Sequence, residues 1–270
     1  MTSHQTDAML SLKAEQAELA AAQAQGKPAP VFPWHPQMDS WGPSMLYNAM
    51  IAPLTPLPIR GVLWYQGETN SALERYATYD RVMRTLIEDW RRQWAVGAFP
   101  FLYVQISNFK SSPFEDWAEL RQQQVKTLGL RNTAMAVTID IGNPDDVHPT
   151  DKVDVGHRLA LAARDLTYGE SIEDSGPMFR QATPEGPAIR AWFDHAKGLV
   201  AKGGEVTSIE VAGADGKFAP ATARIEGETL VASSPDVPDP VAIRYGWANS
   251  PQCNLFNGEG LPASPFTSVH

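Results

Sequence analysis

The most informative part of the chain is residues 59–70, which read IRGVLWYQGETN. This run of apolar, β-branched and aromatic residues has no polar alternation, and it stops abruptly on a polar loop that contains glycine. Such a run is typical of a strand buried on both faces, and strands of this kind belong mostly to parallel sheets covered by helices. The sequence therefore predicts an α/β fold in which this strand lies inside a parallel sheet.

The polar loop that follows this strand is the first candidate site. In open α/β sheets the loops at the carboxyl ends of the strands form the binding crevice. The polar residues expected at that rim are Gln66, Glu68, Thr69 and Asn70. Gly67 would let the backbone approach a ligand closely. The ordinary alternative is a turn in which Asn70 or Ser71 only caps the following helix.

The pattern of residues up to Gly169 alternates between strand and helix. The expected elements are a strand at 60–66, a helix at 71–94, a strand at 100–106, a helix at 114–128, a strand at 133–139 and a helix at 153–168. This order predicts right-handed crossovers and a parallel sheet with flanking helices. A helix at 3–26 and an ordered, irregular segment at 27–58, lying across the body of the domain, are expected before it.

Beyond Gly169 the pattern changes to short β-prone runs separated by Gly, Pro and Asp turns. These runs are at 188–193, 208–212, 222–225, 229–232 and 241–247. The sequence therefore predicts an α/β domain at 1–170 and an antiparallel β domain at 171–270, with the boundary near residues 170–185.

Composition limits the class of protein. The chain has 270 residues, 43% of them hydrophobic, and a mean hydropathy of -0.28, which suits a globular protein with a substantial core. No apolar run approaches the roughly 20 residues of a membrane-spanning helix, and the N-terminus lacks a signal-peptide pattern. A net charge of -9 without a basic cluster argues against nucleic acid as a partner. The single Cys253 rules out an internal disulfide and a cysteine-built zinc site.

A second polar loop, residues 140–149, follows another expected strand and should rise on the same rim. His148 stands three residues after Asp145, a spacing at which the carboxylate can hold one ring nitrogen while the other nitrogen acts as general base. Asp146 is the rival orienting group, and Asp140 is a distant third. The ordinary alternative is an acidic loop with a partly exposed histidine. A divalent metal on these four side chains is disfavoured because no second histidine is placed to complete the site, so no metal or cofactor is expected.

With both loops considered, the sequence resembles the sialate O-acetylesterase family, carbohydrate acetylesterases of the SGNH-hydrolase type. The matching stretches are residues 43–54 (PSMLYNAMIAPL), 61–70, 134–152 and 253–266. The resemblance implies a flavodoxin-like sheet and a Ser-His-Asp mechanism that removes acetyl groups from sugar hydroxyls, with an acetylated sugar or another small ester as substrate. It suggests a periplasmic or secreted protein, and a cytoplasmic location stays open.

The resemblance also implies roles for the first loop. Gln66, the Gly67 amide and Asn70 are the candidate oxyanion donors, while Glu68 would orient its neighbours or meet sugar hydroxyls. SGNH enzymes commonly have Gly-x-Asn, whereas Asn70 here follows Gly67 by three. Gln66 is therefore the better donor candidate.

Two segments of the family have no counterpart in this sequence. Family members carry a Gly-Gln-Ser-Asn-Met-like segment with the nucleophilic serine, and then a glycine-rich segment with an oxyanion donor. The chain thus resembles the C-terminal half of such an enzyme, with a sheet that is incomplete on its N-terminal side. The serine-bearing strand is central in this fold, so its loss would leave residues 60–66 as an exposed apolar edge. We expect a complementary N-terminal fragment, a second copy of the chain or a rearranged N-terminal segment to cover that edge.

Three functional hypotheses follow. The favoured one is an acetylesterase whose serine comes from outside this chain. The second is a self-sufficient esterase that uses Ser44, in a turn that superficially resembles a nucleophile turn, or Ser71 near the rim. The third is a non-catalytic carbohydrate-binding or interaction protein that keeps the crevice without a nucleophile.

Overall fold

The computed structural model describes residues 3–30, 44–111 and 113–269. Two compact units, Met1–Pro58 and Ile59–His270, are each described by themselves. In the first unit the predicted helix at 3–26 is confirmed as α1 (Ser3–Ala24), which is rich in Ala, Gln and Glu, residues that favour helices. It ends in a Schellman motif: Gly26 has a φ of +63°, and the Lys27 amide donates to the Ala22 carbonyl oxygen at 3.0 Å.

The rest of the first unit is a pair of short helical turns, η1 (Tyr47–Ile51) and η2 (Ala52–Leu54). Among the side chains described in this unit, those of residues 13–30 and 44–58, none is buried. The irregular segment predicted at 27–58 falls partly on residues 31–43, which lie outside the described residues. The described part of this unit therefore has no buried core of its own.

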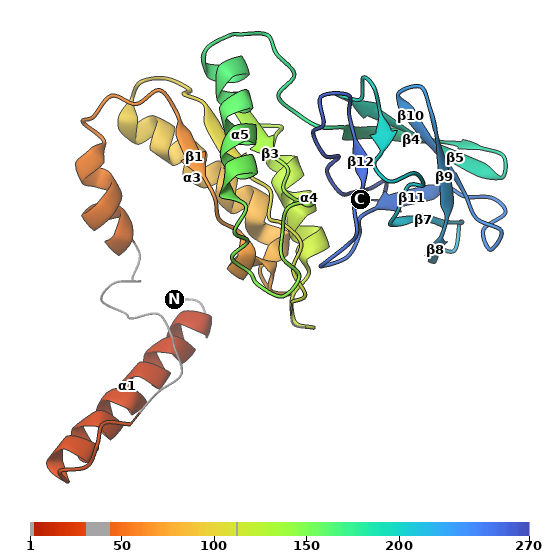
Figure 1. Cartoon of the computed structure of the whole chain (residues 1–270). Coiled ribbons are helices and arrows are strands. Elements are labelled where there is room, and N and C mark those ends of the chain that lie inside the picture. Colours follow the sequence, from red (N-terminus) through yellow and green to blue (C-terminus); the bar gives the residue numbers. More distant parts are fainter. Residues whose placement is uncertain (1–2, 31–43, 112, 270) are drawn as a thin grey trace. The chain divides into compact units, whose positions relative to one another are not determined.

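The second unit begins with the predicted parallel sheet (Figure 1). Its strands are β1 (Val62–Trp64), β2 (Phe101–Val104) and β3 (Thr133–Ala136), in the order β1-β2-β3, and both pairs are parallel. Each strand is followed by a helix: α3 (Tyr79–Trp94), α4 (Trp117–Thr127) and α5 (Lys152–Ala162), the last extended by η5 (Ala163–Thr167). This confirms the alternating strand-helix pattern. No helix among the described residues is both long and apolar enough to cross a membrane.

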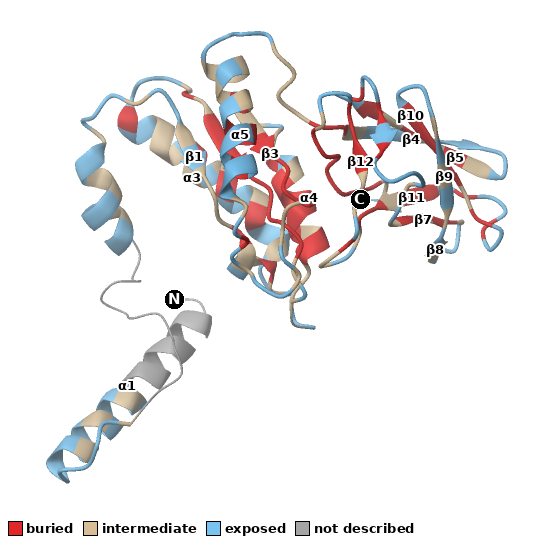
Figure 2. Ribbon diagram, in the orientation of Figure 1, coloured by how far each residue is buried: buried red, intermediate tan, exposed pale blue. Residues whose placement is uncertain are grey.

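Helices cover both faces of this sheet. On one face α5 joins a buried cluster with β2 and β3: Leu102, Val104, Ala136, Val155, Leu159 and Ala162. On the other face Trp64 of β1 meets Trp90 of α3 edge-on, with ring centroids 5.8 Å apart. Tyr103 of β2 donates a hydrogen bond of 2.7 Å to the Gln124 carbonyl oxygen of α4. In this part of the unit the buried residues accordingly concentrate in the central strand β2 and in α4 (Figure 2).

One edge strand of this sheet, β1, differs from the sequence prediction. All four residues of β2 are buried, as an apolar run of this kind predicts. β1 lies at the edge, where it pairs with β2 alone among the described strands, and Leu63 is 64% exposed. The prediction that the opening strand is buried on both faces is wrong, because Leu63 shares the Leu102 face of the sheet, and the α5 cluster on that face includes residues of β2 and β3 but none of β1. Within the unit Ile59–His270, β1 is thus an edge strand with one exposed apolar side chain, Leu63, and the covering of this edge stays a prediction.

The remainder of the second unit consists of antiparallel sheets around one core. One sheet has the order β4-β5-β10-β9, with strands Met178–Glu185, Ala188–Asp194, Thr229–Ser233 and Thr222–Glu226. The other has the order β13-β11-β7-β8, with strands Phe266–Thr267, Ala242–Tyr245, Ile209–Ala212 and Phe218–Pro220. β12 (Leu255–Phe256) pairs with β6 (Val200–Ala201). The predicted change to antiparallel β structure is thus confirmed.

A buried arginine joins the parallel and antiparallel parts. The Arg121 side chain in α4 is fully buried, and its guanidinium donates to carbonyl oxygens of Ile106 and Ser107 after β2 and of Ala248 and Asn249 after β11. Four carbonyl oxygens compensate the desolvation of one buried cation. The two parts therefore lie in one compact unit, while the domain boundary near residue 170 stays a prediction.

Candidate functional site

The loops after β1 and β3 line one cleft at the carboxyl-terminal edge of the parallel sheet. Its volume is about 500 Å³, and its lining comes from both loops and the start of α5: Tyr65, Glu68, Thr69, Val147, His148 and Lys152. Parallel strands end at the same edge of a sheet, so loops distant in sequence meet there. The expectation that the two polar loops face one crevice is met.

An amide pair shapes the first loop. Gln66 donates from Nε2 to Oδ1 of Asn70 at 2.7 Å, and the Gln66 carbonyl oxygen accepts a hydrogen bond of 3.1 Å from the Tyr79 hydroxyl. Because the Asn70 oxygen is already used, its Nδ2 group is the part of that amide left to donate. The two predicted donors are therefore coupled, with Gln66 holding Asn70.

Glycine is required at the centre of this loop. A Cβ atom on the buried Gly67 would lie 3.0 Å from Cγ2 of Ile106 and 3.1 Å from Nε2 of Gln124. The loop continues as the short helix η3 (Glu68–Ser71) and, after η4 (Tyr76–Thr78), α3 begins at Tyr79. The alternative in which Asn70 or Ser71 caps the long helix is therefore wrong.

The two predicted serines have different surroundings. Ser71 is fully buried, and its hydroxyl donates to the Glu68 carbonyl oxygen at 2.6 Å, so it supports the loop from beneath. Ser44 is exposed, has a φ of +65° and belongs to the unit Met1–Pro58. Neither hydroxyl is among the groups that line the cleft.

Two residues that the sequence analysis did not single out help to form the cleft. The Lys152 ammonium lies over the Tyr65 ring, 4.6 Å from its centroid. Burial, and then the Glu68 carboxylate, raise the pKa of Tyr65 to about 12, so its phenol stays neutral at ordinary pH. Their positions in the sequence could have identified them, because Tyr65 directly precedes Gln66 and Lys152 begins the helix after the histidine loop. The cleft thus offers an aromatic ring, a cation and an anion.

The His148 ring makes no hydrogen bond to a carboxylate of a described residue. It is 89% exposed, and its Nδ1 lies 3.8 Å from Oδ1 of Asp146, too far for a hydrogen bond. The same Asp146 oxygen accepts the His148 backbone amide at 2.9 Å. Asp145 instead contacts the Lys110 ammonium at 3.0 Å, and both of those side chains are exposed. Asp146 therefore shapes the turn, while Asp145 is free to exchange partners.

The third predicted orienting group has another role. Asp140 makes a two-pronged ion pair with Arg158 of α5, with N···O distances of 2.6 and 2.7 Å. Arg158 also donates to the Val137 carbonyl oxygen at 2.6 Å. Proposing Asp140 as a holder of the histidine was wrong, because its carboxylate anchors the base of the loop to α5.

A separate acidic group lies before β4 and after β5. Glu173, Asp174 and His195 bring their possible ligand atoms within 4.8 Å of one another, and Nδ1 of His195 is 2.7 Å from Oε1 of Glu173. Burial and the nearby Asp165 raise the pKa of Asp174. Such groups are common without an ion, and this one shares no residue with the cleft.

Comparisons with known proteins agree on one group of enzymes. Residues 32–165 match the family model described as carbohydrate esterase, sialic acid-specific acetylesterase. The chain is 32% identical over 253 residues to the sialate O-acetylesterase of Mus musculus and 34% identical over 257 residues to that of Homo sapiens. Each alignment covers 83% of this chain but 47% and 48% of the relative, respectively, so the chain spans about half the length of these relatives.

A solved structure of a carbohydrate acetylesterase is also similar to this chain. A carbohydrate acetylesterase from Xanthomonas citri aligns with a TM-score of 0.80 and 46% sequence identity. The alignment covers 83% of this chain and 54% of that one. At this identity the likeness extends beyond the fold to the sequence.

Proposed function

This chain belongs to the sialate O-acetylesterase family, and we propose that its cleft is the histidine and oxyanion side of a carbohydrate acetylesterase active site. The observation that carries the proposal is one cleft of about 500 Å³ whose lining includes Glu68 and Thr69, from the loop that the Gln66–Asn70 hydrogen bond holds, together with His148 from the second loop. That volume is in the range of small-molecule sites. The proposed substrate is an acetylated sugar.

The proposed reaction is acyl transfer through a serine that comes from outside this chain. The serine hydroxyl attacks the acetyl carbonyl carbon while His148 takes its proton. The tetrahedral intermediate then expels the sugar oxygen, which receives that proton from His148. Water, deprotonated in turn by His148, hydrolyses the acetyl-serine, so that acetate and the free serine are released.

We assign the orienting carboxylate to Asp145. Asp146 is committed to the His148 backbone amide, whereas Asp145 is held only by an exposed contact with Lys110. Exposed ion pairs contribute about 0–1 kcal/mol, so exchanging Lys110 for the His148 ring costs little. The three-residue spacing between Asp145 and His148 permits that exchange.

We assign the oxyanion donor on this side to Asn70. The sequence favoured Gln66, but the Gln66 amide already donates to the Asn70 oxygen. This hydrogen bond turns the Asn70 nitrogen away from Gln66, so that nitrogen can donate to a substrate. A donor that is fixed before the reaction stabilises the developing negative charge without reorganisation, and one such donor contributes about 3 kcal/mol. Glu68 and the Tyr65 ring are then available to contact sugar hydroxyls and the sugar face.

The missing nucleophile fits the edge of the sheet. Within the unit Ile59–His270, β1 has a neighbouring strand, β2, on one side only, and its Leu63 side chain is 64% exposed. Unpaired apolar edges are normally covered in folded proteins. We propose that a serine-bearing segment pairs with β1 and so brings its hydroxyl to the carboxyl edge, beside the cleft.

A fluorophosphonate probe, which labels activated serines, tests this function. The complementary part would be the portion of the Xanthomonas citri acetylesterase that this chain does not cover. We expect labelling of that part only when it is mixed with the chain, and loss of labelling with His148→Ala. Labelling of the isolated chain would instead support a self-sufficient esterase with its own serine. Sugar binding without labelling in the mixture would support a non-catalytic carbohydrate-binding protein.

A further inference from the structure

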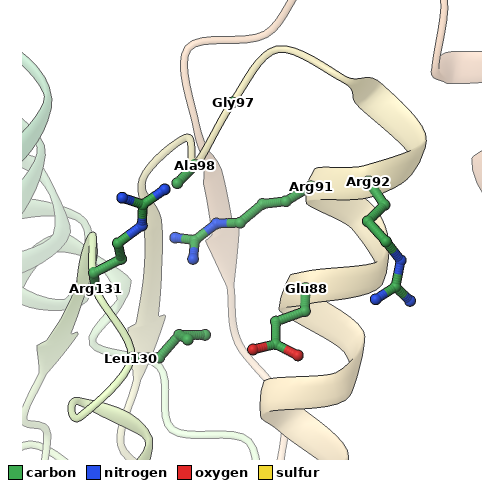
Figure 3. A pocket seen from close by; sticks show the side chains of 7 residues that line it. All are labelled: Glu88, Arg91, Arg92, Gly97, Ala98, Leu130 and Arg131. Carbon is green, nitrogen blue, oxygen red and sulfur yellow. The ribbon is translucent and has the colours of Figure 1, made fainter.

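A second cavity, lined by arginines, lies at the opposite edge of the parallel sheet from the cleft. It is formed by the end of α3, the loop before β2 and the loop before β3, and its volume is about 450 Å³. Figure 3 shows Arg91 extending from α3 toward the loop that carries Arg131, with Glu88 below and Leu130 beside them. Because these loops precede the strands, the cavity is separate from the proposed catalytic chemistry.

The cavity has a rigid frame. Arg91 donates through Nε and Nη2 to the Phe99 carbonyl oxygen at 3.1 and 2.8 Å, and through Nη2 to the Asn132 carbonyl oxygen at 2.9 Å. The Asn132 side chain donates to the Ala98 carbonyl oxygen at 2.6 Å, which ties the two loops together. These bonds use Nε and Nη2 of Arg91, so its Nη1 group remains available to a ligand.

The lining carries more positive than negative charge. Arg92 is neutralised by Asp89 at 2.9 Å, whereas Arg131 is exposed and makes no hydrogen bond or ion pair to another described residue. Burial and the nearby Arg131 charge lower the pKa of Arg91, and Glu88 opposes that effect. Two guanidinium groups therefore repel each other across a shared space, and an anion between them would relieve that repulsion.

We propose that Arg91 and Arg131 form a binding site for a small oxyanion, either a phosphate or a carboxylate group. Guanidinium groups donate parallel N–H bonds that match the oxygens of both. Nη1 of Arg91 and the free fork of Arg131 supply the donors. Glu88 weakens the site by repelling the ligand. The site goes beyond the esterase function and does not depend on it.

Calorimetric titration of the whole chain at low salt tests the site with three probes: inorganic phosphate, glucuronate and glucose. We expect binding of at least one anion and none of glucose. Stronger binding of phosphate would assign the site to phosphoryl groups, and stronger binding of glucuronate would assign it to sugar carboxylates. Absence of binding by both anions, or equal binding of glucose, would overturn the proposal.

Variants locate the binding. Arg131→Ala should weaken the favoured anion about tenfold, because a charge-assisted hydrogen bond is lost. Glu88→Gln should strengthen it, because a like charge is removed. Arg81→Ala, an exposed arginine farther back along α3, is the matched control and should leave affinity unchanged. Equal losses for Arg131→Ala and Arg81→Ala would mean diffuse attraction and would contradict a defined site.

Discussion

The side chains on the two sides of the cleft are held to very different degrees. Asn70 is fixed by Gln66, whose backbone is itself bonded to Tyr79. The His148 ring is 89% exposed, and its nearest carboxylate oxygen is 3.8 Å away. A general base must be held close to its reactive position, and displacement by about 1 Å can lower the rate about 100-fold. We therefore expect His148 to be ordered only when the serine-bearing segment or a substrate closes the cleft.

The first prediction concerns the carboxylate that holds His148. In the complemented enzyme, Asp145→Asn should lower kcat for a small acetyl ester by at least about 100-fold with little change in KM, because the imidazolium loses its partner. Asp146→Asn should lower kcat less, since Asp146 accepts the backbone amide and shapes the turn. Lys110→Ala is the control and should leave kcat unchanged or raised, because Lys110 competes for Asp145. A larger loss for Asp146→Asn would reverse the two roles.

The second prediction concerns the only cysteine. The Cys253 thiol packs against the core of the antiparallel part, and burial raises its pKa to about 12 from an ordinary 9.0. At pH 8 its thiolate fraction should be roughly 1000-fold lower than that of an ordinary thiol, so iodoacetamide should react at a correspondingly low rate. Because the folded-state pKa of the thiol is above its ordinary 9.0, its contribution to folding stability is fully present below about pH 9 and is lost as pH rises from 9.0 to about 12.

Mass spectrometry of the alkylated chain provides the measurement for Cys253. The same chain unfolded in urea is the control, and it should be modified quickly at pH 8. Modification of the folded chain at the unfolded rate would show that the thiol is not buried in solution.

At the scale of elements, the sequence predicted those whose pattern is local. β2 and α5 were predicted because a buried strand and an amphipathic helix each have a repeating pattern along the chain. β1 was placed correctly but given two buried faces, since an apolar run does not reveal how far the covering helices extend over an edge strand. β8 was missed, because three residues that end in Pro220 are too short and too weakly β-prone to signal a strand.

The candidate site likewise has features that follow from local sequence and features that depend on tertiary packing. The cleft could be placed from the two loops because the ends of parallel strands share one edge. The Asp140–Arg158 ion pair could not be predicted, since its members are 18 residues apart and meet only when α5 packs on the sheet. The contact between Lys152 and Tyr65 depends on the same packing.

The third prediction concerns the attachment of the histidine loop to α5. Asp140 and Arg158 are 14% and 8% exposed, so removing one partner leaves the other charge buried and unpaired. Asp140→Ala should lower the free energy of unfolding by about 3–5 kcal/mol, measured by urea denaturation. Arg164→Ala, which breaks the exposed pair with Glu170, is the control and should have no measurable effect. Equal and small losses for both variants would mean that the buried pair does not anchor the loop.

At the scale of the whole molecule, exposed apolar side chains in each of the two units bear on the partner proposed above. One exposed apolar surface is that of Leu63 on β1. The other, in the first unit, includes the exposed side chains of Met45, Leu46, Met50, Leu54 and Leu57. Where such side chains form a contiguous apolar patch, the patch usually marks an interaction site. A partner that brings the catalytic serine would cover the first surface and complete the cleft in one step.

The last prediction tests that partner at the β1 edge. Burial of a leucine side chain contributes about 1.5–3 kcal/mol, so Leu63→Lys should weaken assembly with the serine-bearing part of the Xanthomonas citri enzyme by roughly 10- to 100-fold. Lysine is also the residue by which natural edge strands resist pairing. Val241→Lys places the same charge on another exposed apolar position, 52% exposed before β11, and should leave assembly unchanged. Analytical ultracentrifugation measures the affinity, and fluorophosphonate labelling should fall in parallel. Undiminished assembly of Leu63→Lys would mean that the serine reaches the cleft without pairing to β1.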